Sequence, residues 1–146
     1  MKTKIKYLLQ FFILSGVLFG CAKDQDQIIP YVRVQFSVYL SYPSSSALSS
    51  VNNAILYPGV GYNRNGVIVY RNSIDEFTAY DATCPKHLDT KITAVKLDDG
   101  GSAGSATCPE CKTIYYLFNY AYPAKGEYPL KCYNVTKSGS TLLINN

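Results

Sequence analysis

The chain has 146 residues, of which 47% are hydrophobic and only 16% are charged. These proportions are typical of a folded protein and exclude an intrinsically disordered chain. Three of the 14 basic residues lie within the first six positions, so the remainder carries 11 basic against 10 acidic residues. A nearly neutral domain offers no basic stripe to the phosphate backbone, and nucleic-acid binding is therefore excluded.

The first twenty residues have the pattern of a secretory signal peptide. Basic residues at the start are followed by an apolar run over residues 7–19, shorter than the about 20 residues of a transmembrane helix. The sequence Leu-Phe-Gly-Cys at residues 18–21 resembles the lipobox of bacterial lipoproteins. This resemblance implies that residues 1–20 are removed and that Cys21 is lipidated, which anchors a protein to a membrane without spanning it. The alternative is an ordinary cleaved signal peptide with an incidental cysteine.

Residues 22–26 also resemble the short acidic signals of some surface lipoproteins of Bacteroidetes-like bacteria. The resemblance implies a lipid-anchored protein of the cell envelope, in the outer membrane or at the cell surface rather than in the inner membrane. We expect a lipidated linker over residues 21–30 and one folded domain over residues 31–146.

The folded part is predicted to consist of short strands. The clearest strand covers residues 32–40, where apolar and polar side chains alternate. The serine-rich residues 42–53 are predicted to form a loop without a helix, because they lack charge and helical periodicity. Other strands are predicted at residues 54–57, 66–71, 77–80, 92–97, 105–107, 130–135 and 141–144. We therefore predict an all-β fold, a small antiparallel sandwich or barrel.

Two short loops contain the residues that predict chemistry. They read Cys84-Pro-Lys-His87 and Cys108-Pro-Glu-Cys111, and His87 is the only histidine of the chain. Two side chains three residues apart can converge from one tight turn, and thiolate together with imidazole suits zinc or iron. These four residues are the predicted metal site. Cys132 lies within a predicted strand, and we interpret it as a packed side chain outside the site.

The surroundings of the two loops resemble a Rieske iron-sulfur domain over about residues 66–146. The resemblance rests on Tyr-Asp-Ala-Thr-Cys-Pro at residues 80–85, Thr-Cys-Pro at residues 107–109 and the segment 128–135. It implies a Rieske-type fold with a two-loop cluster-binding subdomain, a two-iron, two-sulfur (2Fe-2S) cluster, electron transfer and a redox partner protein.

The ligand loops depart from the Rieske pattern. In that family each loop begins with a cysteine on one iron, and a histidine from each loop binds the other iron. Here His87 comes one residue later than the first of those histidines, Cys111 occupies the place of the second, and Lys112 stands where a glycine normally follows.

Three interpretations of the site are left open. The first is an electron-transfer module with a 2Fe-2S cluster. The second and third make the chain a structural or interaction protein of the cell envelope, with a Cys₃His zinc or with a disulfide in place of the cluster.

An enzyme with its own turnover is not expected. No orienting third group accompanies Cys84 and His87, so no catalytic residue is assigned. No glycine-rich phosphate loop occurs either, so no nucleotide cofactor is expected.

Overall fold

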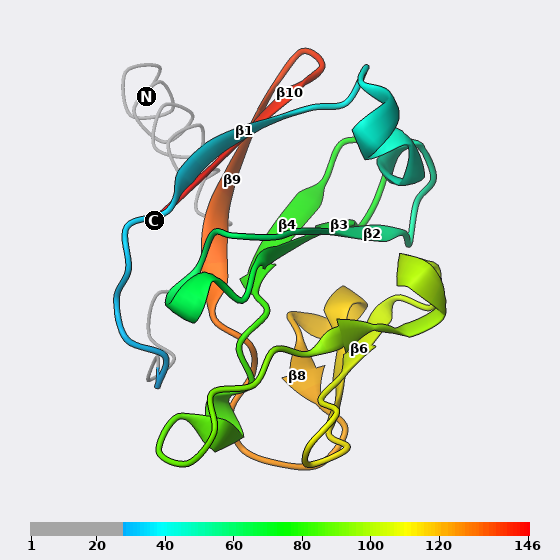
Figure 1. The fold of residues 1–146 in the computed structure, drawn as a ribbon. Coiled ribbons are helices and arrows are strands. Elements are labelled where there is room, and N and C mark those ends of the chain that lie inside the picture. The colour runs from blue at the N-terminus through cyan, green and yellow to red at the C-terminus, as the bar shows by residue number, and fades with distance from the viewer. Residues whose placement is uncertain (1–27) are drawn as a thin grey trace, which may run out of the picture.

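The computed structural model describes residues 28–146, which form two antiparallel sheets (Figure 1). The larger sheet has the strand order β1-β10-β9-β4-β3-β2 and the smaller one β5-β6-β7-β8. The strands of the larger sheet are β1 (Gln35–Tyr39), β2 (Ala54–Tyr57), β3 (Val67–Arg71), β4 (Phe77–Asp81), β9 (Cys132–Ser138) and β10 (Thr141–Asn145). Those of the smaller sheet are β5 (Lys96–Leu97), β6 (Ser105–Thr107), β7 (Ile114–Tyr116) and β8 (Tyr122–Pro123).

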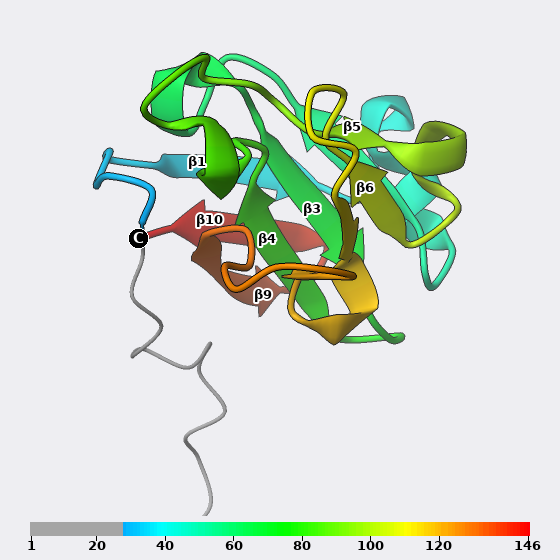
Figure 2. The ribbon, with the colours of Figure 1, turned by 90° about the horizontal axis from the view of Figure 1, so that it is seen from below.

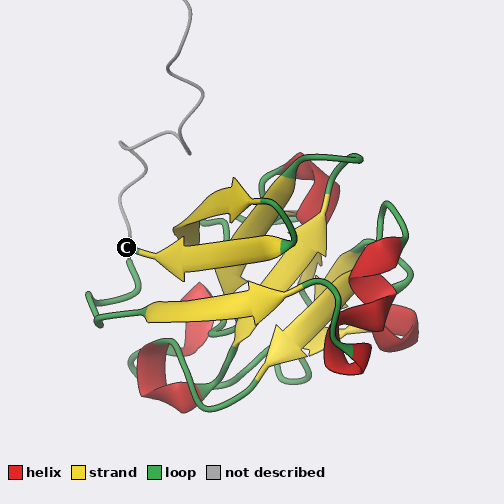
Figure 3. Ribbon diagram, turned by 90° about the horizontal axis from the view of Figure 1, so that it is seen from above, coloured by secondary structure: helices red, strands yellow, loops and turns green. Residues whose placement is uncertain are grey.

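The helices within residues 28–146 are short 3₁₀ segments that lie at the periphery of the sheets (Figure 3). They are η1 (Pro43–Ser49), η2 (Tyr62–Arg64), η3 (Pro85–His87), η4 (Asp98–Gly101) and η5 (Leu117–Asn119). In this part of the chain, no helix has the length and apolar character that crossing a bilayer requires.

The predicted all-β class is confirmed by this topology. After β4 the chain forms a loop, the antiparallel pair β5-β6, a second loop, strands β7 and β8, and the closing hairpin β9-β10. Strand, loop, hairpin, loop and closing hairpin is the order expected from the Rieske resemblance. The small sheet packs as a separate layer beside β3 and β4 (Figure 2).

Several elements differ from the sequence predictions: strands β7 and β8 were not predicted, and β1 is shorter than predicted. Helix η1 lies inside residues 42–53, so the prediction that this segment lacks a helix is wrong. Pro43 provides its first residue, and Ser45 and Leu48 are buried three residues apart, as the three-residue turn of a 3₁₀ helix allows. The predicted strand at residues 92–97 pairs only at Lys96–Leu97, apart from one isolated bridge. Strand β9 continues to Ser138 because a two-residue turn leads into β10.

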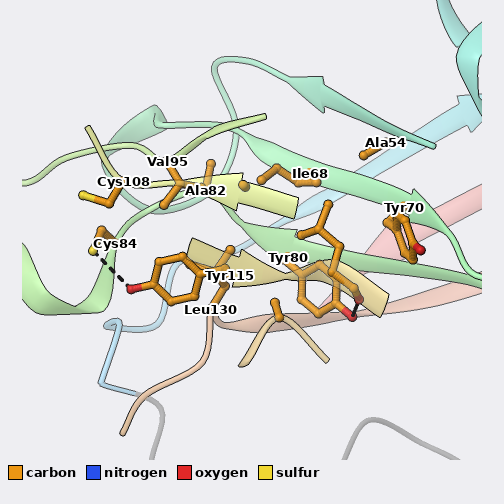
Figure 4. Packing of buried hydrophobic residues seen from close by; sticks show 13 residues of the cluster. Ala54, Ile68, Tyr70, Tyr80, Ala82, Cys84, Val95, Cys108, Tyr115 and Leu130 are labelled. Carbon is orange, nitrogen blue, oxygen red and sulfur yellow. Dashed lines mark hydrogen bonds between the residues drawn. The ribbon is translucent and has the colours of Figure 1, made fainter. Parts of the chain in front are cut away.

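Strand β3 separates two hydrophobic cores. Val67 and Val69 belong to a core that the curled large sheet encloses, whereas Ile68 and Tyr70 face the small sheet. A strand buried on both faces has a continuous apolar sequence, as β3 does. We call the first the large-sheet core: Val34, Val38, Leu48, Val67, Val69, Phe77, Ala79, Tyr133, Leu142 and Ile144. The second is the inter-sheet core (Figure 4): Ala54, Ile68, Tyr70, Tyr80, Ala82, Cys84, Val95, Ala106, Cys108, Tyr115, Leu117, Ala121 and Leu130.

The chain packs against the large sheet from the start of the described region. Ile29 is buried, and Lys131 Nζ donates a hydrogen bond to the carbonyl oxygen of Pro30 (3.1 Å). The predicted signal peptide and the predicted lipidation site, Cys21, lie outside the described residues.

Candidate metal centre

The structure brings the four predicted ligands together at one end of the inter-sheet core. The donor atoms of Cys84, His87, Cys108 and Cys111 all lie within 4.8 Å of one another. Cys84 and Cys108 are fully buried, and the other two are partly buried. The Sγ atoms of Cys84 and Cys111 are 3.9 Å apart, and the three cysteines are free thiols. The group thus has the make-up of a metal site, and the disulfide considered for these loops is not formed.

The first loop is a tight turn that follows β4. The hydrogen bond from the Cys84 N–H to the carbonyl oxygen of Thr93 (2.8 Å) fixes the first residue of this turn. The His87 N–H donates to the carbonyl oxygen of Cys84 (3.3 Å), which closes η3, and Pro85 stiffens the turn between them. Cys84 and His87 are therefore presented to the same point.

A buried carboxylate holds the chain just before this turn. Asp81 Oδ1 accepts a hydrogen bond from the Thr83 N–H (2.8 Å), and Oδ2 accepts from the Tyr62 N–H (2.7 Å) and the Tyr133 hydroxyl (2.6 Å). A buried charge requires partners of this kind. Burial, together with the bond to Asp81, raises the pKa of Tyr133 well above its ordinary value. The sequence analysis did not identify this support for Cys84.

The second loop connects β6 to β7 and contains a strained residue. The Cys108 N–H donates to the carbonyl oxygen of Thr113, and the Lys112 N–H donates to that of Cys108, both at 2.9 Å. Lys112 has φ +58°, in the left-handed region that favours glycine. A glycine, which the Rieske pattern has at this position, would adopt this left-handed conformation without strain.

An ion pair joins the two loops at the surface. Lys91 Nζ of the first loop lies 2.6 Å from Glu110 Oε1 of the second. Both side chains are exposed, so we assign the pair little stabilising effect.

His87 has an unusual buried nitrogen. Its Nε2 atom is inaccessible to solvent and has no hydrogen-bond partner among the described residues. A buried polar atom without a partner is costly, and a neutral imidazole nitrogen is a common metal ligand. A metal ion would satisfy this atom, so the imidazole and the three thiols fit a zinc or iron centre.

The surroundings of two of the sulfurs differ. Cys84 Sγ lies 3.3 Å from the hydroxyl of Tyr115, but burial dominates and raises the pKa of Cys84 to about 12 (Figure 4). Burial also opposes ionisation of Cys111, yet hydrogen bonding with Thr113, together with the neighbouring His87 and Cys108, outweighs it and lowers the pKa of Cys111 to about 6. Cys111 is thus the thiol that ionises more readily, and the thiolate is the form that binds metals.

A lysine reaches Cys111 through one hydroxyl group. Lys86 Nζ donates to Thr113 Oγ1 (3.1 Å), and the Cys111 thiol donates to the same oxygen (3.1 Å). When Cys111 is a thiolate, the Thr113 hydroxyl can donate to the sulfur while it accepts from Lys86. This arrangement places a cation one hydrogen bond beyond a ligand.

Sequence analysis missed Thr113 and Tyr115 as parts of the site. Both are buried, whereas Ile114 between them is exposed. Side chains two residues apart share one face of a strand, so counting in steps of two from Cys111 would have found them. Cys132 is not one of the four converging residues and lies at the edge of the inter-sheet core.

Comparison with known proteins found a distantly similar structure. No family model matches the chain, and no curated protein does. Among solved structures, the ferredoxin of carbazole 1,9a-dioxygenase from Nocardioides aromaticivorans IC177 is similar at 16% sequence identity, with a TM-score of 0.41. The similarity covers 65% of this chain and 86% of that ferredoxin. The metal centre is therefore assigned from the residues of this chain.

Proposed function

We propose that this chain is an electron-transfer protein of the bacterial cell envelope that binds iron through Cys84, His87, Cys108 and Cys111. The observation that carries the proposal is the convergence of three free thiols and one unpartnered imidazole nitrogen within 4.8 Å. Iron bound by thiolates supplies a one-electron couple. The Rieske resemblance implies a 2Fe-2S cluster and a redox partner protein, and electron transfer requires iron whether one or two irons are bound.

The residues around the site suit this role. Cys84 and Cys108 are fully buried, which keeps water from their sulfurs, whereas His87 and Cys111 are partly exposed. The His87 and Cys111 edge is therefore where we propose that a partner protein docks. The hydroxyls of Tyr115 and Thr113 lie within hydrogen-bond distance of two ligand sulfurs, and such contacts tune the potential of a metal centre.

The test is a redox titration of the full chain after anaerobic purification and loading with iron. We expect one reversible one-electron transition, which Cys108→Ala should abolish together with iron binding. Glu110→Gln, in the same loop but exposed and outside the ligand group, is the matched control and should keep the transition. Stable metal binding without any redox transition would contradict the proposal.

A structural zinc site is the second candidate. The four donors form a closed Cys₃His set, and structural zinc sites are tetrahedral with no open position for substrate. The chain isolated from its own host with zinc and without iron would favour this candidate, whereas competition in vitro does not decide, because such ligands bind zinc more tightly than iron whatever the native metal is. The chain would then be a structural or interaction protein of the envelope.

We also propose that lipid at Cys21 holds the domain on the outer membrane or at the cell surface. The support is the signal pattern of residues 1–20 with the lipobox-like sequence ahead of Cys21. Labelled palmitate should be incorporated by the full chain and not by the Cys21→Ala variant, which should leave the membrane fraction. An unlabelled full chain would contradict the anchor.

A further inference from the structure

The spacing of the ligands carries information about how many metal ions they hold. In the Rieske arrangement Cys84 and Cys108 bind one iron, whereas His87 and the residue at position 111 bind the other. Two bridging sulfides separate the irons, and each ligand points away from the opposite iron. Ligands on different irons must therefore lie further apart than ligands on the same iron.

The structure places such a pair close together. Cys84 and Cys111, which would belong to different irons, have their Sγ atoms 3.9 Å apart. On one tetrahedral ion with metal–sulfur bonds of about 2.3 Å, two sulfurs lie about 3.8 Å apart. The two sulfurs are thus spaced as neighbours on a single ion.

The whole group follows the same rule. Every pair of donor atoms lies within 4.8 Å, whereas two sulfurs on one tetrahedral ion lie about 3.8 Å apart. The widest pair would therefore have to close by at most about 1 Å to surround one ion. A two-iron cluster would instead require the two pairs of ligands to separate.

The loops favour a single ion for a second reason. Each supplies two donors three residues apart from a turn closed by a hydrogen bond to the carbonyl oxygen of its first cysteine, Cys84 or Cys108. Two loops of Cys-x-x-Cys type, with histidine in one place, are the usual framework of a four-coordinate ion. The extra residue before His87 and the thiol of Cys111, which depart from the Rieske pattern, are the features that create this matched pair of loops.

We propose that Cys84, His87, Cys108 and Cys111 bind one tetrahedral thiophilic ion, iron or zinc, and not a 2Fe-2S cluster. This inference rests on the same site as the proposed function. It differs by fixing the number of ions and by excluding bridging sulfide.

The deciding measurement is the metal and acid-labile sulfide content of the full chain, purified anaerobically without a metal-binding tag. One metal ion per chain and no sulfide are expected. Two irons with two sulfides would overturn the inference but leave electron transfer intact, whereas one zinc would support the inference and overturn electron transfer. A chain that binds no metal under these conditions, or on addition of zinc or iron, would overturn both.

A titration with Co²⁺ gives an independent readout, because its absorption bands report tetrahedral thiolate coordination. We expect an end point at one Co²⁺ per chain. Cys111→Ala should weaken binding more than about 100-fold, since even changes outside the ligand shell cost 10–100-fold. Glu110→Gln should not change the end point or the affinity, and an end point at two ions with tetrahedral spectra would overturn the inference.

Discussion

The large-sheet core and the inter-sheet core are stabilised in different ways. The first contains aliphatic and aromatic side chains from β1, β3, β4 and β10, strands of five residues each, and from the seven-residue β9. The second lies against a small sheet whose strands have only two or three residues, and two of its buried members are the ligands Cys84 and Cys108. The first region is therefore built from packed side chains alone, whereas the second includes two of the four candidate ligands in its core.

The comparison shows where function affects the fold. A short-stranded sheet has few ladder hydrogen bonds and little apolar area of its own. Its two ligand loops approach one another at the thiols and the imidazole, where a bound ion would join them more strongly than the exposed ion pair of Lys91 and Glu110 does. The stability of the small sheet should therefore depend on the metal, and that of the large sheet should not.

Removal of the metal should have the largest effect. Chelation should lower amide hydrogen-exchange protection by at least about 100-fold in β5–β8 and the ligand loops, because metal binding contributes directly to local stability. Protection in β3, β4 and β10 should change far less. Equal losses in both sheets would contradict the division into two regions.

Truncation of the large-sheet core should be costly but independent of metal. Leu142, fully buried in β10, is a suitable position. Leu142→Ala should lower the free energy of unfolding by about 2–5 kcal/mol, measured by urea denaturation with and without bound metal. A difference of more than about 1 kcal/mol between the two forms would show that the cores are coupled.

Alkaline pH should loosen the contact between the sheets. The Tyr80 hydroxyl donates to the carbonyl oxygen of Leu117 in the small-sheet region (3.1 Å), and burial raises the pKa of Tyr80 from 10.0 to about 12. The phenol is favoured over the phenolate in the folded state. The contribution of the Tyr80 hydroxyl to the free energy of unfolding is complete below pH 10 and is lost as the pH rises through 12.

The measurement for this effect is the free energy of unfolding between pH 8 and 12. Tyr80→Phe should flatten the decline above pH 10, although it lowers stability at pH 8 by about 1 kcal/mol through the lost hydrogen bond. Tyr42→Phe, at an exposed position, is the control. An unchanged slope in Tyr80→Phe would contradict the assignment.

Relief of the strained turn should have the smallest effect. Lys112→Gly should raise the free energy of unfolding of the metal-bound protein by about 1 kcal/mol, because glycine adopts the left-handed conformation without strain. Thermal denaturation measures this change. Lys112→Ala removes the same side chain but keeps the strain. No gain of the glycine variant over the alanine variant would argue against strain at this position.

Periodicity predicted the strands whose sequence and packing agree. Val34 and Val38 are buried as their alternation indicates, and the hairpin of β3 and β4 follows from a β-branched run and its turn. Periodicity failed for residues 92–97, of which only Lys96 and Leu97 pair with a strand. The residues before them are held by backbone hydrogen bonds to Ala82 and Cys84, at the start of the first ligand loop. The 3₁₀ helix η1 was missed because a helix of two turns is too short to show a period.

The site was predictable in composition but not in its surroundings. The four converging residues follow from the spacing of Cys84, His87, Cys108 and Cys111, since chemistry and tight turns restrict where such side chains point. The support by Asp81 depends on contacts with residues 19 and 52 positions away in the chain. Such long-range pairing is set by the sheet topology, which local sequence does not specify.

The alternation of β3 has a consequence for signalling. Among the described residues no buried side chain belongs to both cores, but the hydrogen bond from Tyr133 to Asp81 joins the large-sheet core to the chain just before Cys84. A protein bound near β1 and β10 would therefore sense the state of the site through this buried hydrogen bond, whereas a partner at the ligand loops would sense it directly.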